Sequence, residues 1–448
     1  MRGEDVKEIF EAILPEEALM EVVRAAGLQQ RERKLDALRL LRAMIIAAAS
    51  GHGGRQADIL RVYLHGFNSE TIRVVRGGFY SWFGEPLERV MSQVSGLALS
   101  YARSRRRDLP GFLGDCADDW LIVDSTTVRL DKKLAKEYPG AGDYAALKVH
   151  KLFSVGLGTT IAYHLSPAKE HDAKHLQIDE SWAGKGLLAD LGYASLKLIA
   201  DCEWCGAHYV IRLKSNWKPR VQKIRRGEVN KTFVAGSDLD LLLEQEVIAL
   251  NGKVIDAEVR IGGAANEVFA RLAGVPTPKG YCFYLTSLPP TVGPQQVATL
   301  YRVRWEIESD NKLDKSCHRL DEIGAQTGPS VRALVHASMT ASIIICLLAH
   351  AHRLEEGSHK RPRPRTVPPI HPQALGRMVA SACHSIAAVF ELTGPAAQAA
   401  WRRLANAFYL MGQDPNWRRR PSVLDELRGY RRHPKPSRNT NHSTCLGA

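Results

Sequence analysis

The stretch Trp120–Leu130, WLIVDSTTVRL, decides the fold class of this chain. Four apolar residues in a row are followed by alternating polar and apolar residues, a pattern typical of a strand buried in a sheet. Asp124 ends the apolar run, where a carboxylate is costly unless it is paired or binds a metal. The stretch therefore predicts a central strand with a polar site at its end.

Segments that follow this strand extend it into an α/β core. LKVHKLFSVGLG (147–158) and TTIAYHLSPA (159–168) predict an antiparallel pair of strands. After a short helix from about residue 172, GLLADLGYA (186–194) predicts a second buried strand, which ends at Asp190. SLKLIADCEWCGA (195–207) predicts a crossover helix, and HYVIRLKS (208–215) predicts a further strand. Strands joined through a helix indicate an α/β core.

The regions around this core divide the chain further. Residues 1–112 show helical periodicity, whereas residues between 216 and 290 form short strand-like segments with an Asn-Gly turn signal at Asn251-Gly252. The helical period returns after Pro294, and the apolar run 333–354 predicts a buried helix rather than a membrane span. A Pro-rich basic linker (357–372), a helical segment and a basic tail follow. We predict boundaries that give the ranges 1–114, 115–215, 216–290, 291–355 and 356–448.

Composition restricts the class of protein and of partner. The 448 residues are 45% hydrophobic and 24% charged, as in soluble globular proteins. A net charge of +13 favours a polyanionic partner, with nucleic acid as the first candidate. The charged, amphipathic start predicts no signal peptide, and the scattered cysteines predict reduced thiols in a cytosol. Cys202 and Cys205 lack a second cysteine pair at zinc-ribbon spacing, so helix packing is favoured over a metal site.

Within Tyr301–Lys315, YRVRWEIESDNKLDK, one carboxylate differs from the others. On a helix that turns about 100° per residue, Glu308 shares a stripe with Tyr301, Arg304, Lys312 and Lys315. The remaining acids fall on the opposite, packing side: Glu306, Asp310 and Asp314, beside Val303 and Ile307. Two readings are open, an exposed Arg304–Glu308 pair on a solvated helix or a functional carboxylate among cations.

Asp124, Asp190 and Glu308 together suggest a site. Two aspartates at the ends of adjacent strands and a glutamate from a packed helix can make the oxygen-ligand site that Mg²⁺ prefers. Two such ions would activate a water or a 3′-hydroxyl for attack on a phosphodiester. The alternative for either aspartate is a turn or a helix N-cap. Asp118 and Asp119 are rivals for the first position, although they precede the strand.

The spacing Tyr301-x2-Arg304-x3-Glu308-x6-Lys315 resembles the Y-R-E-K signature of bacterial cut-and-paste insertion-sequence transposases of the DDE type, the "IS-four" family. IVDSTTV (122–128) and LLADLGYA (187–194) are similar to the segments that carry the two aspartates in that family. YVIRLKSN (209–216) and YLTSLP (284–289) are similar to its flanking strands. The resemblance covers roughly residues 115–320, in family order.

The resemblance implies an RNase H-like (retroviral-integrase-like) catalytic core with an all-β insertion, flanked by N- and C-terminal helical regions. It implies Mg²⁺-dependent cleavage and strand transfer with two ions, for which Mn²⁺ can substitute. Asp124, Asp190 and Glu308 would then hold the metals. The expected DNA contacts are Tyr301, Arg304 and Lys315 on phosphates, with Lys312 and Trp305 nearby. For Trp305, core packing is an equal alternative.

The same resemblance implies the partners of the chain. It implies double-stranded DNA, both transposon ends and target, bound in a homodimeric complex, and no membrane. The N-terminal helical region would bind the terminal inverted repeats, and the protein would act in the bacterial cytoplasm, at the nucleoid. Two other functions stay open: a structure-selective nuclease on the same fold, and a non-catalytic DNA-binding regulator descended from a transposase.

Several residues keep two interpretations. Asn311 stands where relatives often have an aromatic or apolar residue, which affects the expected packing. Tyr281, Phe283 or Trp217 could stack on an extruded base, although strand packing is favoured for each. Four polar residues of the core are expected to be satisfied structural groups: His150, Lys151, His171 and Asp172. The basic cluster is expected to provide either helix-end charges or phosphate contacts: Arg103, Arg105, Arg106 and Arg107.

Overall fold

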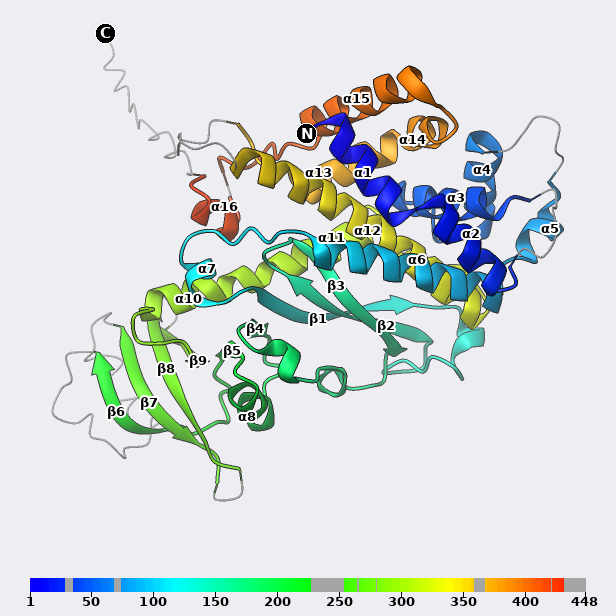
Figure 1. Ribbon diagram of the computed structural model, residues 1–448. Coiled ribbons are helices and arrows are strands. Elements are labelled where there is room, and N and C mark those ends of the chain that lie inside the picture. The colour runs from blue at the N-terminus through cyan, green and yellow to red at the C-terminus, as the bar shows by residue number, and fades with distance from the viewer. Residues whose placement is uncertain are drawn as a thin grey trace, which may run out of the picture.

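A computed structural model describes residues 1–28, 35–67, 74–226, 254–263, 266–278, 280–357, 367–419 and 421–430. The strands in these ranges are β1 (Trp120–Arg129), β2 (Ala146–Ser154), β3 (Thr159–Pro167), β4 (Gly186–Ala189), β5 (His208–Arg212), β6 (Arg220–Arg226), β7 (Ile255–Ile261), β8 (Val268–Thr277) and β9 (Gly280–Thr286). They form one sheet in the order β3-β2-β1-β4-β5-β9-β8-β7-β6 (Figure 1). The fold is therefore mixed α/β, built on one large sheet.

The predicted strands of the core are confirmed, with one change at β1. β1 pairs antiparallel with β2, and β4 pairs parallel with both β1 and β5. Asp124 lies in the middle of β1 rather than at its end, which corrects the predicted position. The reason is that β1 continues beyond its apolar half and pairs with β2 as far as Arg129. Asp124 lies only at the end of the part of β1 that pairs with β4, which stops at Ala189.

The described strands of the predicted all-β insertion continue the same sheet, because β9 pairs antiparallel with β5. The Arg271 guanidinium on β8 is nearly buried and donates two hydrogen bonds of 2.8 Å to the Asp256 carboxylate on β7. It also donates to three carbonyl oxygens just after β9, those of Leu288, Pro289 and Val292. One side chain thus joins the added strands to the segment that returns to the core. The predicted turn at 251–252 lies outside the described residues.

Helices provide the remaining layers. They are α1 (Gly3–Ile13), α2 (Glu16–Ala25), α3 (Ala37–Ala49), α4 (Gln56–Gly66), α5 (Arg76–Tyr80), α6 (Glu85–Ser104), α7 (Phe112–Cys116), α8 (Leu196–Trp204), α10 (Pro294–Arg302), α11 (Glu306–Ser316), α12 (Gly328–Gly357), α13 (Pro372–Ser381), α14 (Cys383–Val389), α15 (Gly394–Met411) and α16 (Val423–Leu427). The predicted helical periodicity of the first 112 residues is confirmed. The domain boundaries stay a prediction, and residues 358–366 and 431–448, which hold most of the linker and of the basic tail, lie outside the described residues.

Alternation along β1 assigns its side chains to two faces of the sheet. Trp120 and Ile122 pack with α10 and α11, whereas Leu121 and Val123 pack in a second core with α8. Side chains two residues apart share a face, so Asp124 points to the face that α11 covers. Cys202 of α8 is buried in the second core, which fits the predicted packing role of that cysteine.

The long apolar helix α12 is the centre of the helical layer (Figure 1). By length and composition it could cross a membrane, yet 89% of its most apolar window is buried inside the protein. It packs against α6, α3 and α1, so its apolar surface is covered by other helices. The prediction of a buried helix is confirmed.

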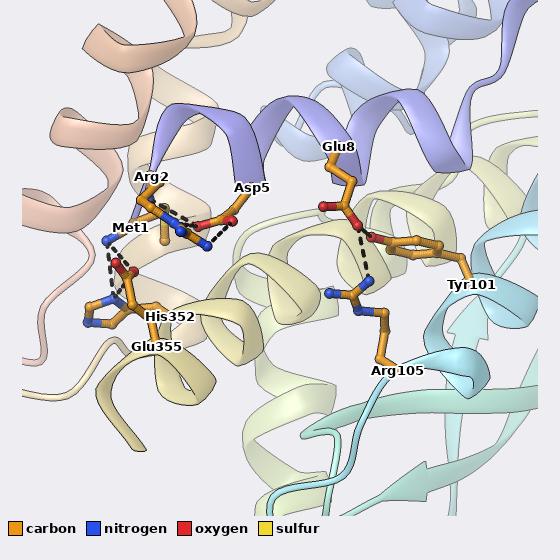
Figure 2. Close-up of polar contacts among 8 residues, drawn as sticks. All are labelled: Met1, Arg2, Asp5, Glu8, Tyr101, Arg105, His352 and Glu355. Carbon is orange, nitrogen blue, oxygen red and sulfur yellow. Dashed lines mark hydrogen bonds and ion pairs between the residues drawn. The ribbon is translucent and has the colours of Figure 1, made fainter. Parts of the chain in front are cut away.

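Polar contacts attach α1 to the helical layer at its start and at its middle (Figure 2). Glu8 accepts hydrogen bonds from the Tyr101 hydroxyl at 3.0 Å and from Arg105 at 3.1 Å. The Met1 ammonium lies 3.1 Å from the Glu355 carboxylate on α12. The first helix is therefore attached to both α6 and α12.

The basic cluster at the C-terminal end of α6 has mostly protein partners. Arg105 pairs with Glu8, Arg103 donates to the Ile161 carbonyl oxygen, and Arg107 donates to Asp119 at 2.9 Å. These contacts favour the structural interpretation for three of the four arginines.

Candidate active site

The parallel register of β1 and β4 brings two of the predicted carboxylates together. The pairing ends with Val123 opposite Ala189. The next residue on each chain is an aspartate, Asp124 on β1 and Asp190 just after β4. Two neighbouring parallel strands at the same level place these residues side by side. The two aspartates are neighbours because each directly follows an apolar run that forms one of the paired strands.

The helix that carries Glu308 is not the continuous helix that the sequence predicted. α10 ends at Arg302, a 3₁₀ turn spans Val303–Trp305, and α11 begins at Glu306. A 3₁₀ turn advances about 120° per residue instead of about 100°, so the predicted positions of Tyr301 and Glu308 around the helix shift by tens of degrees. Arg304 nevertheless lies 3.7 Å from the Glu308 carboxylate, with its side chain only 11% exposed.

Asp124 connects the strand to the helix. Its Oδ2 accepts a hydrogen bond of 2.9 Å from Asn311 Nδ2, three residues beyond Glu308 on α11. Asn311, where a change in packing was expected, therefore makes a polar contact with the first aspartate. A hydrogen bond to an ionised group is worth about 1.5–3 kcal/mol in proteins, so this contact helps to set the distance between α11 and β1.

Asp124 is affected by burial and by the charges around it. Burial raises the pKa of Asp124, and the charges of Glu308 and Asp190 raise it further. The backbone N–H of Ser125 and the Arg304 guanidinium act in the opposite direction. Carboxylates close to one another repel each other, and a divalent cation bound between them would offset that repulsion.

The donor set fits such a cation in chemistry, because all three groups are hard oxygen ligands. Within the described ranges, no group of three His, Cys, Asp or Glu side chains is close enough to form a ready-made metal site. A cation would therefore have to draw the three carboxylates together.

The rival aspartate at the start of β1 is structural. Asp119 is fully buried and accepts hydrogen bonds from Arg107, from the Ser154 hydroxyl and from the backbone N–H groups of Trp120 and Gly156. All of its acceptor capacity is used inside the protein, so it is not available to a ligand.

The predicted DNA contacts fall into two groups. Trp305, Lys312 and Lys315 are exposed, and 62% of Trp305 is accessible, which excludes the core-packing alternative for this residue. Tyr301 is half-buried against Tyr284, with ring centroids 5.0 Å apart, and burial raises its pKa while Arg304 lowers it. The exposed group can reach a ligand directly.

Asp172 near the site is satisfied as expected, whereas His150 is satisfied only at Nε2, because its buried Nδ1 has no hydrogen-bond partner among the described residues. Asp172 accepts from the Ser125 hydroxyl at 3.0 Å and from Lys148 at 2.9 Å, so Asp172 reaches the residue next to Asp124. His150 bonds to the Ser166 hydroxyl at 2.8 Å and stacks on His175.

Of the aromatics considered for base stacking, Phe283 is nearly buried, with Tyr281 stacked on it at 5.8 Å. Trp217 is half-buried, with Lys214 Nζ 5.7 Å from its ring centroid. No one of the three is singled out as a stacking platform by these contacts.

A buried ionic cluster beside the site was missed. Lys151 Nζ donates to Asp310 and Asp314, the two acids that the periodicity had placed on the packing side of the helix. The signal that could have found it is the pattern of β2, where Lys151 occupies an inward position between Val149 and Phe153.

Comparisons with known proteins give the family of the chain. The model of the family named Transposase DDE domain matches residues 116–344. A transposase for insertion sequence element IS231C from Bacillus thuringiensis subsp. berliner is 24% identical over 292 residues, which are 53% of this chain and 60% of the relative. The transposase for IS231B from the same organism is 25% identical over 243 residues, 44% of this chain and 50% of the relative. The chain thus spans about half of the length of the curated relatives that it matches.

A solved structure that is similar to the chain is a piggyBac transposase in a synaptic complex with hairpin DNA, at 11% identity and a TM-score of 0.45. The similarity covers 90% of this chain and 85% of that one. The family match rests on sequence and spans the strands and the helix that carry Asp124, Asp190 and Glu308. Since residues 116–344 are just over half of the 448, the chain belongs to the family of proteins with a transposase DDE domain.

Proposed function

We propose that this chain is a DNA transposase that binds terminal inverted repeats and moves its element by metal-dependent cleavage and strand transfer. The observation that carries the proposal is that Asp124 and Asp190 follow paired positions of two neighbouring parallel strands, while Asp124 accepts a hydrogen bond from Asn311 on the helix that carries Glu308. The order β3-β2-β1-β4-β5, with the first pairs antiparallel and the last parallel, supports an RNase H-like core.

Asp124, Asp190 and Glu308 would hold two Mg²⁺ ions, with Mn²⁺ as a substitute. Bound there, the ions would lower the pKa of a water and stabilise the leaving oxygen. In the first step the water oxygen bonds to phosphorus and the bond to the 3′-oxygen breaks, which leaves a 3′-hydroxyl on the element. In strand transfer that 3′-oxygen bonds to a target phosphorus, and the target's own 3′-oxygen leaves.

The cationic side of α11 supports a phosphate-binding role. Arg304 lies next to Glu308, and Lys312 and Lys315 are exposed on the same helix. Arginine and lysine are the usual donors to DNA phosphates. These residues would hold the scissile strand while Trp305 lies against the adjacent nucleotide.

Binding of the repeats by residues 1–114 and pairing of two ends in a homodimer belong to the same proposal. Sedimentation of the full chain with and without a terminal-repeat duplex tests the pairing. We expect one complex that contains two chains and two duplexes, and a complex of one chain with one duplex would contradict the dimer.

The function is tested by incubating the wild-type protein with Mg²⁺, a labelled duplex that ends in the element's own repeat, and a plasmid target. We expect a nick at the repeat boundary and label joined to the plasmid. Glu308→Gln should bind the duplex and form neither product. Glu322→Gln, which removes an exposed carboxylate outside the site, is the matched control and should keep both activities.

The outcomes separate the candidate functions. Nicking without joined label would indicate a nuclease, and binding without either product would indicate a DNA-binding regulator. Full activity of Glu308→Gln would remove the carboxylate site from the mechanism.

A further inference from the structure

Lys151 is the direct cross-strand neighbour of the first aspartate of the site. In the antiparallel register of β1 and β2, Lys151 stands opposite Asp124. Residues directly opposite each other project from the same face of a sheet, so both side chains point toward α11. Lys151 is completely buried, which is rare for a lysine and requires partners for its charge.

The partners of Lys151 lie on the helix that carries Glu308. Lys151 Nζ donates to Asp310 Oδ2 at 2.9 Å and also to Asp314 Oδ2, one helical turn further on. The Thr160 hydroxyl on β3 donates to the same Asp310 oxygen at 3.1 Å. Burial alone would lower the pKa of Lys151, but the two aspartates raise it above its ordinary value, so the cation is retained.

Three adjacent strands therefore hold one helix by polar contacts. Thr160 on β3 and Lys151 on β2 bind Asp310 of α11, and Asp124 on β1 binds Asn311. Lys151 stands opposite Asp124, whereas Thr160 stands opposite Phe153, two residues further along β2. Contacts from three strands at two levels constrain both the rotation of α11 and its position along the sheet.

Stability does not explain such a cluster. A buried ion pair can usually be replaced by apolar residues of similar size with little loss of stability, or with a gain. In some proteins, buried polar groups instead fix one arrangement of the elements that they join. A rotation of α11 by about 20° would move a carboxylate about 6 Å from the helix axis by about 2 Å, whereas a metal site tolerates only about 0.5 Å.

We propose that Lys151 is a positioning residue, which acts through Asp310 and Asp314 to set the rotation of α11 so that Glu308 can reach a metal ion held by Asp124 and Asp190. The inference rests on the proposed function, in that it assigns a metal centre to these carboxylates. It predicts that the ionic cluster controls metal affinity independently of stability.

The test compares three full-length proteins. Lys151→Met leaves two buried carboxylates without a counter-charge, and Lys151→Met/Asp310→Leu/Asp314→Leu replaces the whole cluster by apolar side chains. Arg332→Met is the matched control, because Arg332 is also one cation held by two carboxylates, Glu88 and Glu137, in the helical layer.

Two quantities are measured for each, the urea midpoint of unfolding and the dissociation constant for Mn²⁺, read from the electron paramagnetic resonance signal of free Mn²⁺. The single variant should lose both stability and affinity. The triple variant should regain the midpoint of the wild type and still bind Mn²⁺ at least tenfold more weakly. Arg332→Met should lose stability and keep wild-type affinity.

A triple variant with wild-type Mn²⁺ affinity would overturn the proposal, because the cluster would then be only a packing element. If the triple variant does not fold, Thr160→Val decides, since it keeps the shape and removes one hydrogen bond to Asp310. An affinity at least threefold weaker supports the proposal, and an unchanged affinity overturns it.

The proposed function can fail separately. If the wild-type protein binds Mn²⁺ through Glu308 but does not cut DNA, the proposed transposase activity is refuted. The positioning role of Lys151 is then still decided by the Mn²⁺ affinities of the variants. A wild-type protein without Glu308-dependent Mn²⁺ binding overturns the positioning role itself.

Discussion

The replacement Arg271→Met tests the junction between the added strands and the core. It keeps most of the volume of the side chain and removes five hydrogen bonds, two to Asp256 and three to backbone carbonyl oxygens of residues 288–292. Asp256 is completely buried, so its carboxylate would be left without a partner.

The magnitude follows from that burial. Removing one partner of a buried pair costs about 3–5 kcal/mol, and each carbonyl oxygen that cannot reach water adds roughly 1 kcal/mol. The contacts to the Leu288 and Val292 carbonyl oxygens are buried, so we expect the free energy of unfolding to fall by about 5–7 kcal/mol in Arg271→Met. The pair variant Arg271→Met/Asp256→Leu removes the stranded charge and should recover about 3 kcal/mol of that loss.

The assay is urea unfolding followed by tryptophan fluorescence and by circular dichroism. Lys197→Met is the matched control, because its pair with Asp201 is an exposed contact between residues four apart on α8 and should contribute less than about 0.5 kcal/mol. If Arg271→Met costs no more than this control, or if the pair variant is less stable than the single one, the reasoning about the buried pair is wrong.

Three further predictions concern the DNA-binding side and the acid stability of the helical layer. Trp305→Ala should leave the unfolding midpoint unchanged and weaken DNA binding by about 1–3 kcal/mol at constant salt, measured by fluorescence anisotropy; unchanged affinity would remove Trp305 from the interface. Lys315→Gln should weaken binding to all sequences alike and reduce the slope of log K against log salt by about one, and an unchanged slope would contradict a phosphate contact. Burial lowers the pKa of His350 to about 3, so the unfolded chain binds a proton between about pH 6.5 and 3 that the folded chain rejects, and stability falls as the pH falls. Between pH 7 and pH 5, the free energy of unfolding of His350→Gln should therefore fall by about 2 kcal/mol less than that of the wild type. If urea titrations show the same fall for both proteins, the prediction is refuted.

The candidate carboxylate site stays a prediction, and the sequence could propose it because its signals are local. Each aspartate follows an apolar run, and the parallel register then makes Asp124 and Asp190 neighbours. Glu308 was distinguishable because its side of the helix carries cations rather than apolar residues. The mixed α/β fold could be predicted for the same reason, from strands and a crossover helix that each have their own periodicity.

What could not be predicted depends on partners far apart in the chain. Lys151 and Asp310 are 159 residues apart, and helical periodicity placed Asp310 on the packing side without identifying its counter-ion. The continuation of the sheet from β5 to β9 likewise depends on pairing across the whole insertion. The 3₁₀ turn before α11 was not predicted, since such turns are short and commonly continue the end of an α-helix.

The central claim, that Asp124, Asp190 and Glu308 hold the catalytic metal ions, is tested most directly by changing each to cysteine. A thiolate is a poor ligand for Mg²⁺ and a better one for Mn²⁺. Cleavage of the labelled terminal-repeat duplex is then measured in each metal. We predict that the three variants are inactive in Mg²⁺ and regain measurable nicking at the repeat boundary in Mn²⁺, while the wild type is active in both. Variants that cut equally well in Mg²⁺, or that no metal restores while their folding and DNA binding are intact, would contradict the account.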